Sequence, residues 1–240
     1  MTKIISAFSG GKDSTCMVLR AAELGMTGEL FFTPTGDELP ELIAHIADIT
    51  ARTGWKLIVK SCGHSLYGLI KRWMALPNHR QRWCTRELKI EPAKAYLLEN
   101  PGSTLLIGLR ADEMEREGLF GEYANYRYPL REWGRRIQDV RKYLADKGVT
   151  VPKRTDCALC YGQRIGEWFA LWQNHPEIYA KGEALEAETG HTFRSPSRDT
   201  WSTSLADLRK EFESGRRPRR SLKLSGEDDT NLDRCTFCNL

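Results

Sequence analysis

A short glycine-containing loop between an apolar strand and a helix constrains the fold of this chain more than any other feature. Residues 4–8 form an apolar run typical of a buried strand, and residues 14–24 carry apolar side chains at helical spacing before Gly25. The sequence between them is Ser9-Gly10-Gly11-Lys12-Asp13. Glycines leave room for backbone N–H groups to close around an anion, and the helix N-terminus adds its positive dipole end. The segment therefore predicts a phosphate-binding turn within an α/β fold.

The side chains of this loop also suit a phosphate ligand. Lys12 supplies a mobile cation, and Ser9 and Ser14 supply hydroxyl donors. The loop differs from the kinase-type pattern Gly-x-x-x-x-Gly-Lys-Ser/Thr, because Ser6 replaces the first glycine and Asp13 follows the lysine. A strand-to-helix turn that binds nothing and exposes a lysine is the alternative interpretation.

Strands and helices alternate through the first half of the chain. We expect strands at residues 29–33, 55–60 and 103–109, and helices at residues 42–53 and 91–98. This alternation predicts a doubly wound, mostly parallel sheet with helices on both faces. After about Arg110 the pattern becomes helical, with helices expected at residues 137–147, 163–173 and 176–189. The expected organisation is an α/β nucleotide-binding domain over residues 1–130 and a helical, cysteine-bearing lobe over residues 131–240.

Composition and charge limit where the protein works and what it binds. No stretch approaches the roughly 20 apolar residues that span a bilayer, and residues 1–5 lead straight into a strand without a signal-peptide core. We therefore expect a cytoplasmic protein with no membrane partner. The net charge of +4 permits a polyanionic partner without requiring one. The run Arg216-Arg217-Pro218-Arg219-Arg220 could contact a nucleic-acid backbone, although a solvated loop is the commoner outcome for such a run.

Four of the seven cysteines fall into two Cys-x-x-Cys pairs, Cys157/Cys160 and Cys235/Cys238. In a reducing compartment such cysteines are more often metal ligands, catalytic groups or thiols than disulfides. Together the two pairs can present four thiolates tetrahedrally, which suits structural zinc or a 4Fe–4S cluster, and the spacing alone does not decide between these metals. Two unrelated pairs of packed thiols, or a redox dithiol at Cys235/Cys238, are the alternatives.

Cys84 and Arg110 are candidates for chemistry near the nucleotide. Cys84 stands between Arg82 and Arg86, whose charges favour the thiolate. It is either a sulfur acceptor or nucleophile, or a turn residue packed beneath the sheet edge. Arg110 follows an expected strand and should emerge at the carboxyl edge of the sheet, where it could hold a phosphate leaving group. An ion pair with a neighbouring carboxylate is the alternative for this arginine.

Several of these motifs together resemble one protein family. Residues 9–14 match Ser-Gly-Gly-Lys-Asp-Ser, the signature of the adenine-nucleotide α-hydrolase superfamily, the PP-loop ATP pyrophosphatases. Four further segments resemble its phosphoadenylyl-sulfate reductase-like branch: residues 32–41, residues 82–89 with Cys84 and Lys89, residues 107–113 with Gly108 and Arg110, and residues 157–168 with the first cysteine pair. The resemblance extends to about Thr189.

The resemblance implies a Rossmann-like PP-loop fold that binds ATP and cleaves it between the α- and β-phosphates to adenylate a substrate. The nucleotide-binding residues that it implies are Ser9, Gly10, Gly11, Lys12, Asp13, Ser14, Asp37, Gly108 and Arg110. The implied catalytic residues are Lys12, Asp13, Cys84 and Arg110. Mg²⁺ would bridge the phosphates, with Asp13 or Asp37 as a ligand. The branch also favours a 4Fe–4S cluster over Zn²⁺ at Cys157, Cys160, Cys235 and Cys238.

Because the branch includes the DNA-phosphorothioation sulfurtransferases, it implies sulfur transfer to a small-molecule or nucleic-acid acceptor, with a sulfur donor protein as partner. A second possibility is reduction of phosphoadenylyl sulfate, with Cys235 or Cys238 attacking sulfur and a thioredoxin-like protein as reductant. A third is a regulatory module that binds a nucleotide without turnover.

Two departures from the reductases favour ATP as the substrate. Lys12 and Asp13 are intact here, whereas the reductases have degenerate loops, and the sequence has Cys235-Thr-Phe-Cys238 where they have Glu-Cys-Gly. Pro34 also replaces the usual aspartate at the end of the second strand, so its role is absent or is taken by Asp37 or Glu38.

Overall fold

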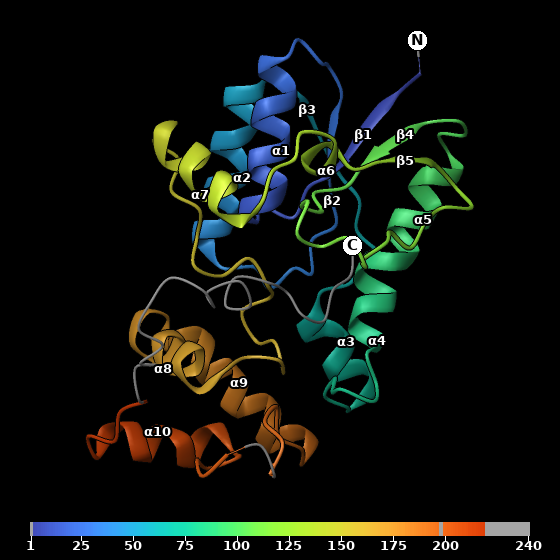
Figure 1. The fold of residues 1–240 in the computed structure, drawn as a ribbon. Helices are drawn as coiled ribbons and strands as arrows, with labels where there is room; N and C mark the ends of the chain where they lie inside the picture. The colour runs from blue at the N-terminus through green and yellow to red at the C-terminus, as the bar shows by residue number, and fades with distance from the viewer. Residues whose placement is uncertain (1, 197–198, 219–240) are drawn as a thin grey trace.

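Five short parallel strands between residues 4 and 127 form one sheet (Figure 1). The computed structural model describes residues 2–196 and 199–218. The strands are β1 (Ile4–Ala7), β2 (Glu29–Phe32), β3 (Lys56–Val59), β4 (Thr104–Leu106) and β5 (Asn125–Arg127), and they lie in the order β3-β2-β1-β4-β5. Every neighbouring pair is parallel. The strand order reverses at β1, so the carboxyl ends of β1 and β4 flank the point where open α/β sheets bind ligands.

Helices cover both faces of this sheet. On one face lie α1 (Lys12–Glu23), α2 (Pro40–Thr53) and α7 (Ile137–Asp146), which share a core that includes Met17, Ile46 and Val140. On the other face α5 (Glu91–Leu98) packs Ala93 and Leu97 against the sheet. Figure 1 shows α1, α2 and α7 together on one side of the strands and α5 on the other. The predicted doubly wound α/β fold is confirmed.

The C-terminal region is helical, and it forms a second core with residues that follow β3. Its helices are α8 (Ile165–Asn174), α9 (Pro176–Thr189) and α10 (Leu205–Glu213). The segment after β3 adds α3 (Leu66–Trp73), α4 (Trp83–Thr85) and a π-helical turn, η1 (Arg86–Ile90). Trp168, Tyr179 and Phe212 are buried together with Leu66 and Leu88. Because α7 joins the sheet core and α3 joins the lobe core, the division at residue 130 stays a prediction.

The sequence patterns located most of these elements. The helices expected at residues 91–98 and 176–189 have these bounds in the structure. The strand expected at residues 103–109 is shorter, because the chain turns after Leu106 and the N–H of Leu109 bonds the carbonyl of Ile107. Sequence analysis did not identify α3, β5, α10 or the short helix α6 (Pro129–Glu132). Within the described residues, no helix has the length and apolar character needed to cross a membrane.

Candidate nucleotide site

The predicted phosphate loop connects β1 to α1 in a conformation that requires glycine. Gly10 has a φ of +74°, and a Cβ atom there would lie 2.5 Å from Leu42 Cδ1 on α2. Gly11 is the N-cap of α1, and its carbonyl accepts hydrogen bonds from Thr15 N (2.9 Å) and Ser14 Oγ (3.1 Å). The Ser9 hydroxyl accepts from Gly11 N at 3.3 Å. The hydroxyls of Ser9 and Ser14 therefore brace the loop at the N-terminus of α1, and α2 leaves no room for a Cβ atom on Gly10.

A cavity begins at this loop and extends over the sheet edge toward α5. Its polar part includes Ser9, Gly11, Lys12, Asp13, Ser14 and Gly108, which the sequence predicted to contact the nucleotide. Its apolar part includes Phe31, Ala93, Leu97, Leu105, Ile107 and Phe120. Ligand sites of this kind combine an apolar wall with a few polar groups that fix orientation. The arrangement suits a molecule with a flat apolar base at one end and phosphates at the other.

Arg110 is wholly buried and organises three carboxylates at the edge of the loop. Its Nη1 donates to Asp13 Oδ2 at 2.7 Å and lies 3.3 Å from Glu113 Oε2, and its Nε donates to Asp112 Oδ1 at 2.9 Å. Burial raises the pKa of Asp13, and the charges of Lys12 and Arg110 oppose this rise. The sequence left open whether Arg110 holds phosphates or pairs with carboxylates. The structure shows the ion pairs, and it places Asp13 rather than Arg110 in the cavity lining.

Gly108 lies in the segment after β4, where the chain passes directly against the start of α1. A Cβ atom on Gly108 would lie 3.0 Å from Ser14 N and 3.2 Å from the carbonyl carbon of Asp13. Both atoms are backbone, so they cannot turn aside as a side chain could. Gly108 is therefore needed for a close approach of two chain segments beside the phosphate loop.

We expect Gly108→Ala to destabilise the protein by about 1–3 kcal/mol, since extra volume here must displace backbone. Gly166→Ala is a matched control, because Gly166 lies in α8 with nothing within 4 Å of the added Cβ. The control should be neutral or stabilise by up to about 1 kcal/mol through helix propensity. Urea unfolding of both variants measures this difference. Equal stability of the two variants would contradict the close approach.

Glu38, rather than Asp37, lines the cavity. The Glu38 carboxylate accepts from Thr35 Oγ1 at 2.7 Å and from Gly36 N at 3.0 Å, which closes the turn after β2. Asp37 points its carboxylate at the start of α3 instead, where Oδ2 accepts from Tyr67 N at 2.9 Å. Burial raises the pKa of Asp37. A nucleotide or Mg²⁺ contact of Asp37 stays a prediction, and its carboxylate has a structural partner here.

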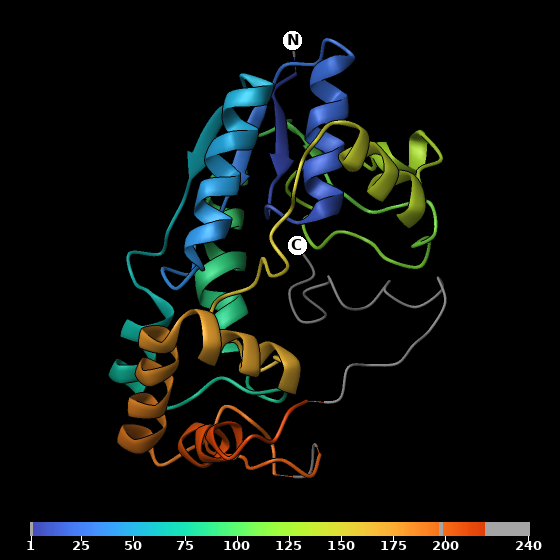
Figure 2. The ribbon, with the colours of Figure 1, turned by 90° about the vertical axis from the view of Figure 1, so that its left-hand side faces the viewer.

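The chain between α7 and α8 crosses the phosphate loop and adds residues that no motif indicated. Thr155, Asp156 and Cys157 line the cavity. Cys157 forms an isolated antiparallel bridge with Glu38, and Ala158 N donates to the carbonyl of Asp37 at 2.7 Å. Figure 2 shows this segment running down beside α1 to α8. The crossing ties the lobe to the loop after β2 and to the cavity.

The predicted cysteine site is only partly within the described residues. Cys157 is half-buried at the cavity, and Cys160 is buried with its sulfur accepting from Gly162 N at 3.4 Å. Cys235 and Cys238 lie outside the described residues, so a shared metal site stays a prediction. Within residues 2–196 and 199–218, no group of three or more His, Cys, Asp or Glu side chains is arranged to hold a metal ion. Cys84 packs against the lobe core and does not line the cavity.

Lys89, Arg116 and Phe120 also line the cavity, and the sequence assigned none of them a role. Lys89 belongs to the segment around Cys84 that carried the family resemblance, so its motif was a usable signal. Arg116 and Phe120 lie in the loop between β4 and β5, which carries no motif.

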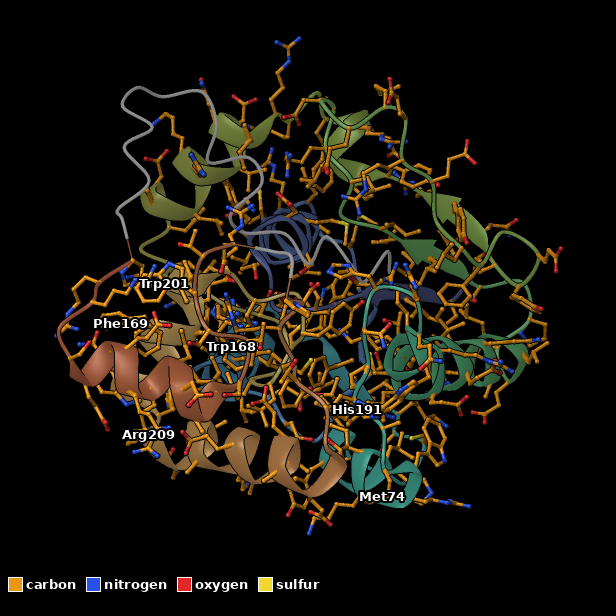
Figure 3. All side chains as sticks on the ribbon, turned by 90° about the horizontal axis from the view of Figure 1, so that it is seen from below. Met74, Trp168, Phe169, His191, Trp201 and Arg209 are labelled. Carbon is orange, nitrogen blue, oxygen red and sulfur yellow. The ribbon has the colours of Figure 1, made fainter. Side chains whose placement is uncertain are left out.

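Two arginines of the basic run at residues 216–220 interact within the lobe. The guanidinium of Arg216 lies 3.9 Å from the ring centroid of Trp201, and that of Arg217 lies 5.1 Å from the centroid of Phe169. Arg217 Nη1 also donates to the carbonyl of Phe212 at 2.7 Å. Figure 3 shows Phe169 and Trp201 close together beside α10. A nucleic-acid contact of this run stays a prediction, and Arg219 and Arg220 lie outside the described residues.

Comparisons with known proteins agree with this architecture. Two uncharacterized proteins of Methanocaldococcus jannaschii, MJ0066 and MJ0973, are each 26% identical to the chain over 77% and 74% of its length. The chain spans less than half of these relatives, 42% and 46% of their lengths. The crystal structure of a phosphoadenylyl-sulfate (PAPS) reductase from Candida auris, in a phosphate complex, superposes with a TM-score of 0.53 at 16% identity. That match covers 63% of this chain and 75% of the other and shows a common fold.

The sequence itself identifies the family. Residues 3–153 match the phosphoadenosine phosphosulfate reductase domain, and this range includes the phosphate loop, the whole sheet and α7. The match covers more than half of the chain. The protein therefore belongs to the phosphoadenosine phosphosulfate reductase domain family.

Proposed function

We propose that the protein binds ATP and cleaves it between the α- and β-phosphates in order to adenylate a substrate for sulfur transfer. One observation carries the proposal. An intact phosphate loop, with Lys12 and Asp13, forms the polar end of a cavity whose other end is apolar. The adenine would lie against Phe31, Leu97 and Ile107, and the α-phosphate would receive the N–H groups of the loop.

In this mechanism a substrate oxygen attacks the α-phosphorus, the bond to the β-phosphate breaks, and pyrophosphate leaves. Lys12, which lines the cavity, would offset the charge that develops on the phosphates. The outer sulfur of a donor persulfide then attacks the adenylated substrate, and AMP leaves with the substrate oxygen. A second thiol cleaves the S–S bond that joins donor and substrate, which releases the substrate with its new thiol. The acceptor would be a small molecule or a nucleic acid.

The carboxylates of the cavity fit a magnesium ion. Asp13 Oδ1 and Asp156 Oδ1 are both buried without a hydrogen-bond partner among the described residues. Mg²⁺ is held in nucleotide sites by one or two carboxylates together with the phosphates. Bound there, it would neutralise charge on the leaving pyrophosphate. We therefore favour Asp13 and Asp156 as magnesium ligands over Asp37, because the Asp37 carboxylate accepts a hydrogen bond from the start of α3.

A 4Fe–4S cluster would be held by Cys157, Cys160, Cys235 and Cys238, with Zn²⁺ as the alternative. The bond from Gly162 N to Cys160 Sγ is the kind of contact that stabilises a metal-bound thiolate. Because Cys157 lines the cavity, the site would border the nucleotide.

We expect anaerobically purified protein to be brown, and we expect Cys157→Ser and Cys238→Ser each to remove the colour, because each deletes one of four ligands. Cys62→Ser is the control and should keep the colour, since Cys62 belongs to neither pair. The visible spectrum and the metal content measure the outcome. Colourless protein with one zinc ion per chain would show that the site binds zinc and not an iron–sulfur cluster. Full metal content in both variants would contradict the shared site.

Reduction of phosphoadenylyl sulfate is the second candidate, and membership of the phosphoadenosine phosphosulfate reductase domain family favours it. It would require Cys235 or Cys238 to attack the sulfate sulfur and a thioredoxin-like protein to restore the thiol. A nucleotide-binding module without turnover is the third candidate and would show binding alone.

Product analysis separates these functions. With Mg²⁺ and α-labelled ATP, we expect AMP or an AMP adduct together with pyrophosphate once an acceptor is present. We expect ATP to raise the melting temperature more than phosphoadenylyl sulfate does, through mass action on the folded state. We also expect no sulfite from phosphoadenylyl sulfate with reduced thioredoxin. ADP and orthophosphate as products would contradict cleavage at the α-phosphate, and sulfite production that is lost in Cys235→Ser would establish the reductase.

A further inference from the structure

A second groove adjoins the phosphate loop on the side of α7. Its lining comes from the C-terminal half of α7 and the segment that follows it, with Leu144, Val149 and Val151 as apolar wall. Gly11, Lys12 and Thr155 line both this groove and the nucleotide cavity. The two spaces therefore meet at the loop, on either side of the chain that crosses it. A molecule in the groove would lie next to the α-phosphate of a nucleotide in the cavity.

Cations line the groove. Lys12, Arg141 and Lys153 contribute to its lining, and none of the described residues that line it is Asp or Glu. Residues 131–154, which form α7 and its flanks, contain eight Lys and Arg against three Asp and Glu, a net charge of +5. The whole chain has a net charge of +4. Arg141 and Lys153 are the two cations of this positively charged segment that line the groove.

Neighbouring cations in this segment have structural partners outside the groove. Lys142 pairs with Asp146 at 2.9 Å, and Lys147 pairs with Glu23. Lys153 is exposed and forms no ion pair with any residue that the structure describes. Its charge is available to a ligand, and Gly11, Lys12 and Thr155 line the same groove.

We propose that this groove binds a phosphate group of the acceptor substrate. The inference rests on the proposed adenylation, because an acceptor must reach the α-phosphorus from a side that the nucleotide does not fill. A phosphate held by Arg141 and Lys153 would bring the rest of the acceptor to Gly11 and Lys12. The phosphate belongs either to a mononucleotide-sized molecule or to the backbone of a nucleic-acid strand.

The test measures binding of two probes, cytidine monophosphate and a fluorescent single-stranded oligonucleotide, in the full chain without ATP. The double variant Arg141→Gln/Lys153→Gln should have a tenfold or more lower affinity for whichever of the two probes the unaltered protein binds. For the oligonucleotide it should also lower the slope of log affinity against log salt by about 1–2, since one or two phosphate contacts are lost. Lys142→Gln is the matched control on the same helix and should change binding less than twofold, because Lys142 is paired with Asp146 outside the groove lining.

Binding of either probe with this pattern supports the groove and identifies the source of the phosphate. Binding of neither probe by the unaltered protein, or an equal loss in Lys142→Gln, would overturn it. ATP affinity, measured separately, should stay within twofold in the double variant. A tenfold loss of ATP affinity would also overturn the proposal, since the groove would then hold the phosphates of ATP itself. If ATP yields ADP while the probe pattern holds, the adenylation fails and the phosphate site stands.

Discussion

Replacing Lys12 with alanine should reduce ATP cleavage by a factor of about 100 or more, because a preorganised charge at the reacting phosphates is worth several kcal/mol. Lys12 is buried, and it lines both the nucleotide cavity and the groove beside α7. Its ammonium lies 4.0 Å from Asp13 Oδ2, so its charge is held at the loop rather than in solvent. Single-turnover release of pyrophosphate from α-labelled ATP measures the effect.

The matched control for this variant is Lys56→Ala, since Lys56 is exposed on the edge strand β3, away from the cavity. It should keep the unaltered rate. Urea unfolding of both variants separates loss of the cation from loss of the fold. Unchanged cleavage in folded Lys12→Ala would contradict the role of the phosphate loop in turnover and would leave nucleotide binding as its function.

The phosphate loop could be predicted from the sequence because its backbone conformation depends on a few neighbouring residues. Gly10 needs a positive φ, and Gly11 starts the helix, so the pattern of residues encodes the geometry directly. The alternation of strands and helices gave the parallel sheet for a similar reason. The α10 helix also has a local signal, since Ser204 caps it and Leu205, Leu208 and Phe212 are buried at helical spacing.

Other parts of the site depend on how distant segments meet. Thr155 and Asp156 line the cavity because the segment that follows α7 crosses the phosphate loop. No sequence motif predicts such a crossing. Glu38 and Asp37 are adjacent in sequence, yet one lines the cavity and the other caps α3. The three-residue β5 lacks an apolar run and gains its place from pairing with β4. Single-sequence patterns carry none of this information.

The buried ion pairs of Arg110 lead to a large expected effect on stability. Arg110→Met should lower the free energy of unfolding at pH 7 by about 3–5 kcal/mol, because it leaves carboxylates without their cation. Glu113 is almost as buried as Arg110, and Asp13 is largely buried. Arg52→Met is the control, since Arg52 pairs with Asp48 at 2.8 Å on an exposed face of α2. That surface pair should contribute less than about 1 kcal/mol.

The cause of the stability loss in Arg110→Met can be identified from how that loss of unfolding free energy depends on pH. Burial already raises the pKa of Asp13 above its usual value, and removal of the arginine deletes a charge that opposes this rise. A carboxyl group whose folded pKa is raised destabilises the protein above that pKa and ceases to do so when it is protonated. The loss of unfolding free energy in Arg110→Met should therefore become smaller as the pH falls from 7 toward 5. The small loss in Arg52→Met should keep its sign and should not increase. Urea unfolding at several pH values measures both curves. If the Arg110→Met variant lost the same free energy of unfolding at every pH, lost packing rather than unpaired carboxylates would cause the instability.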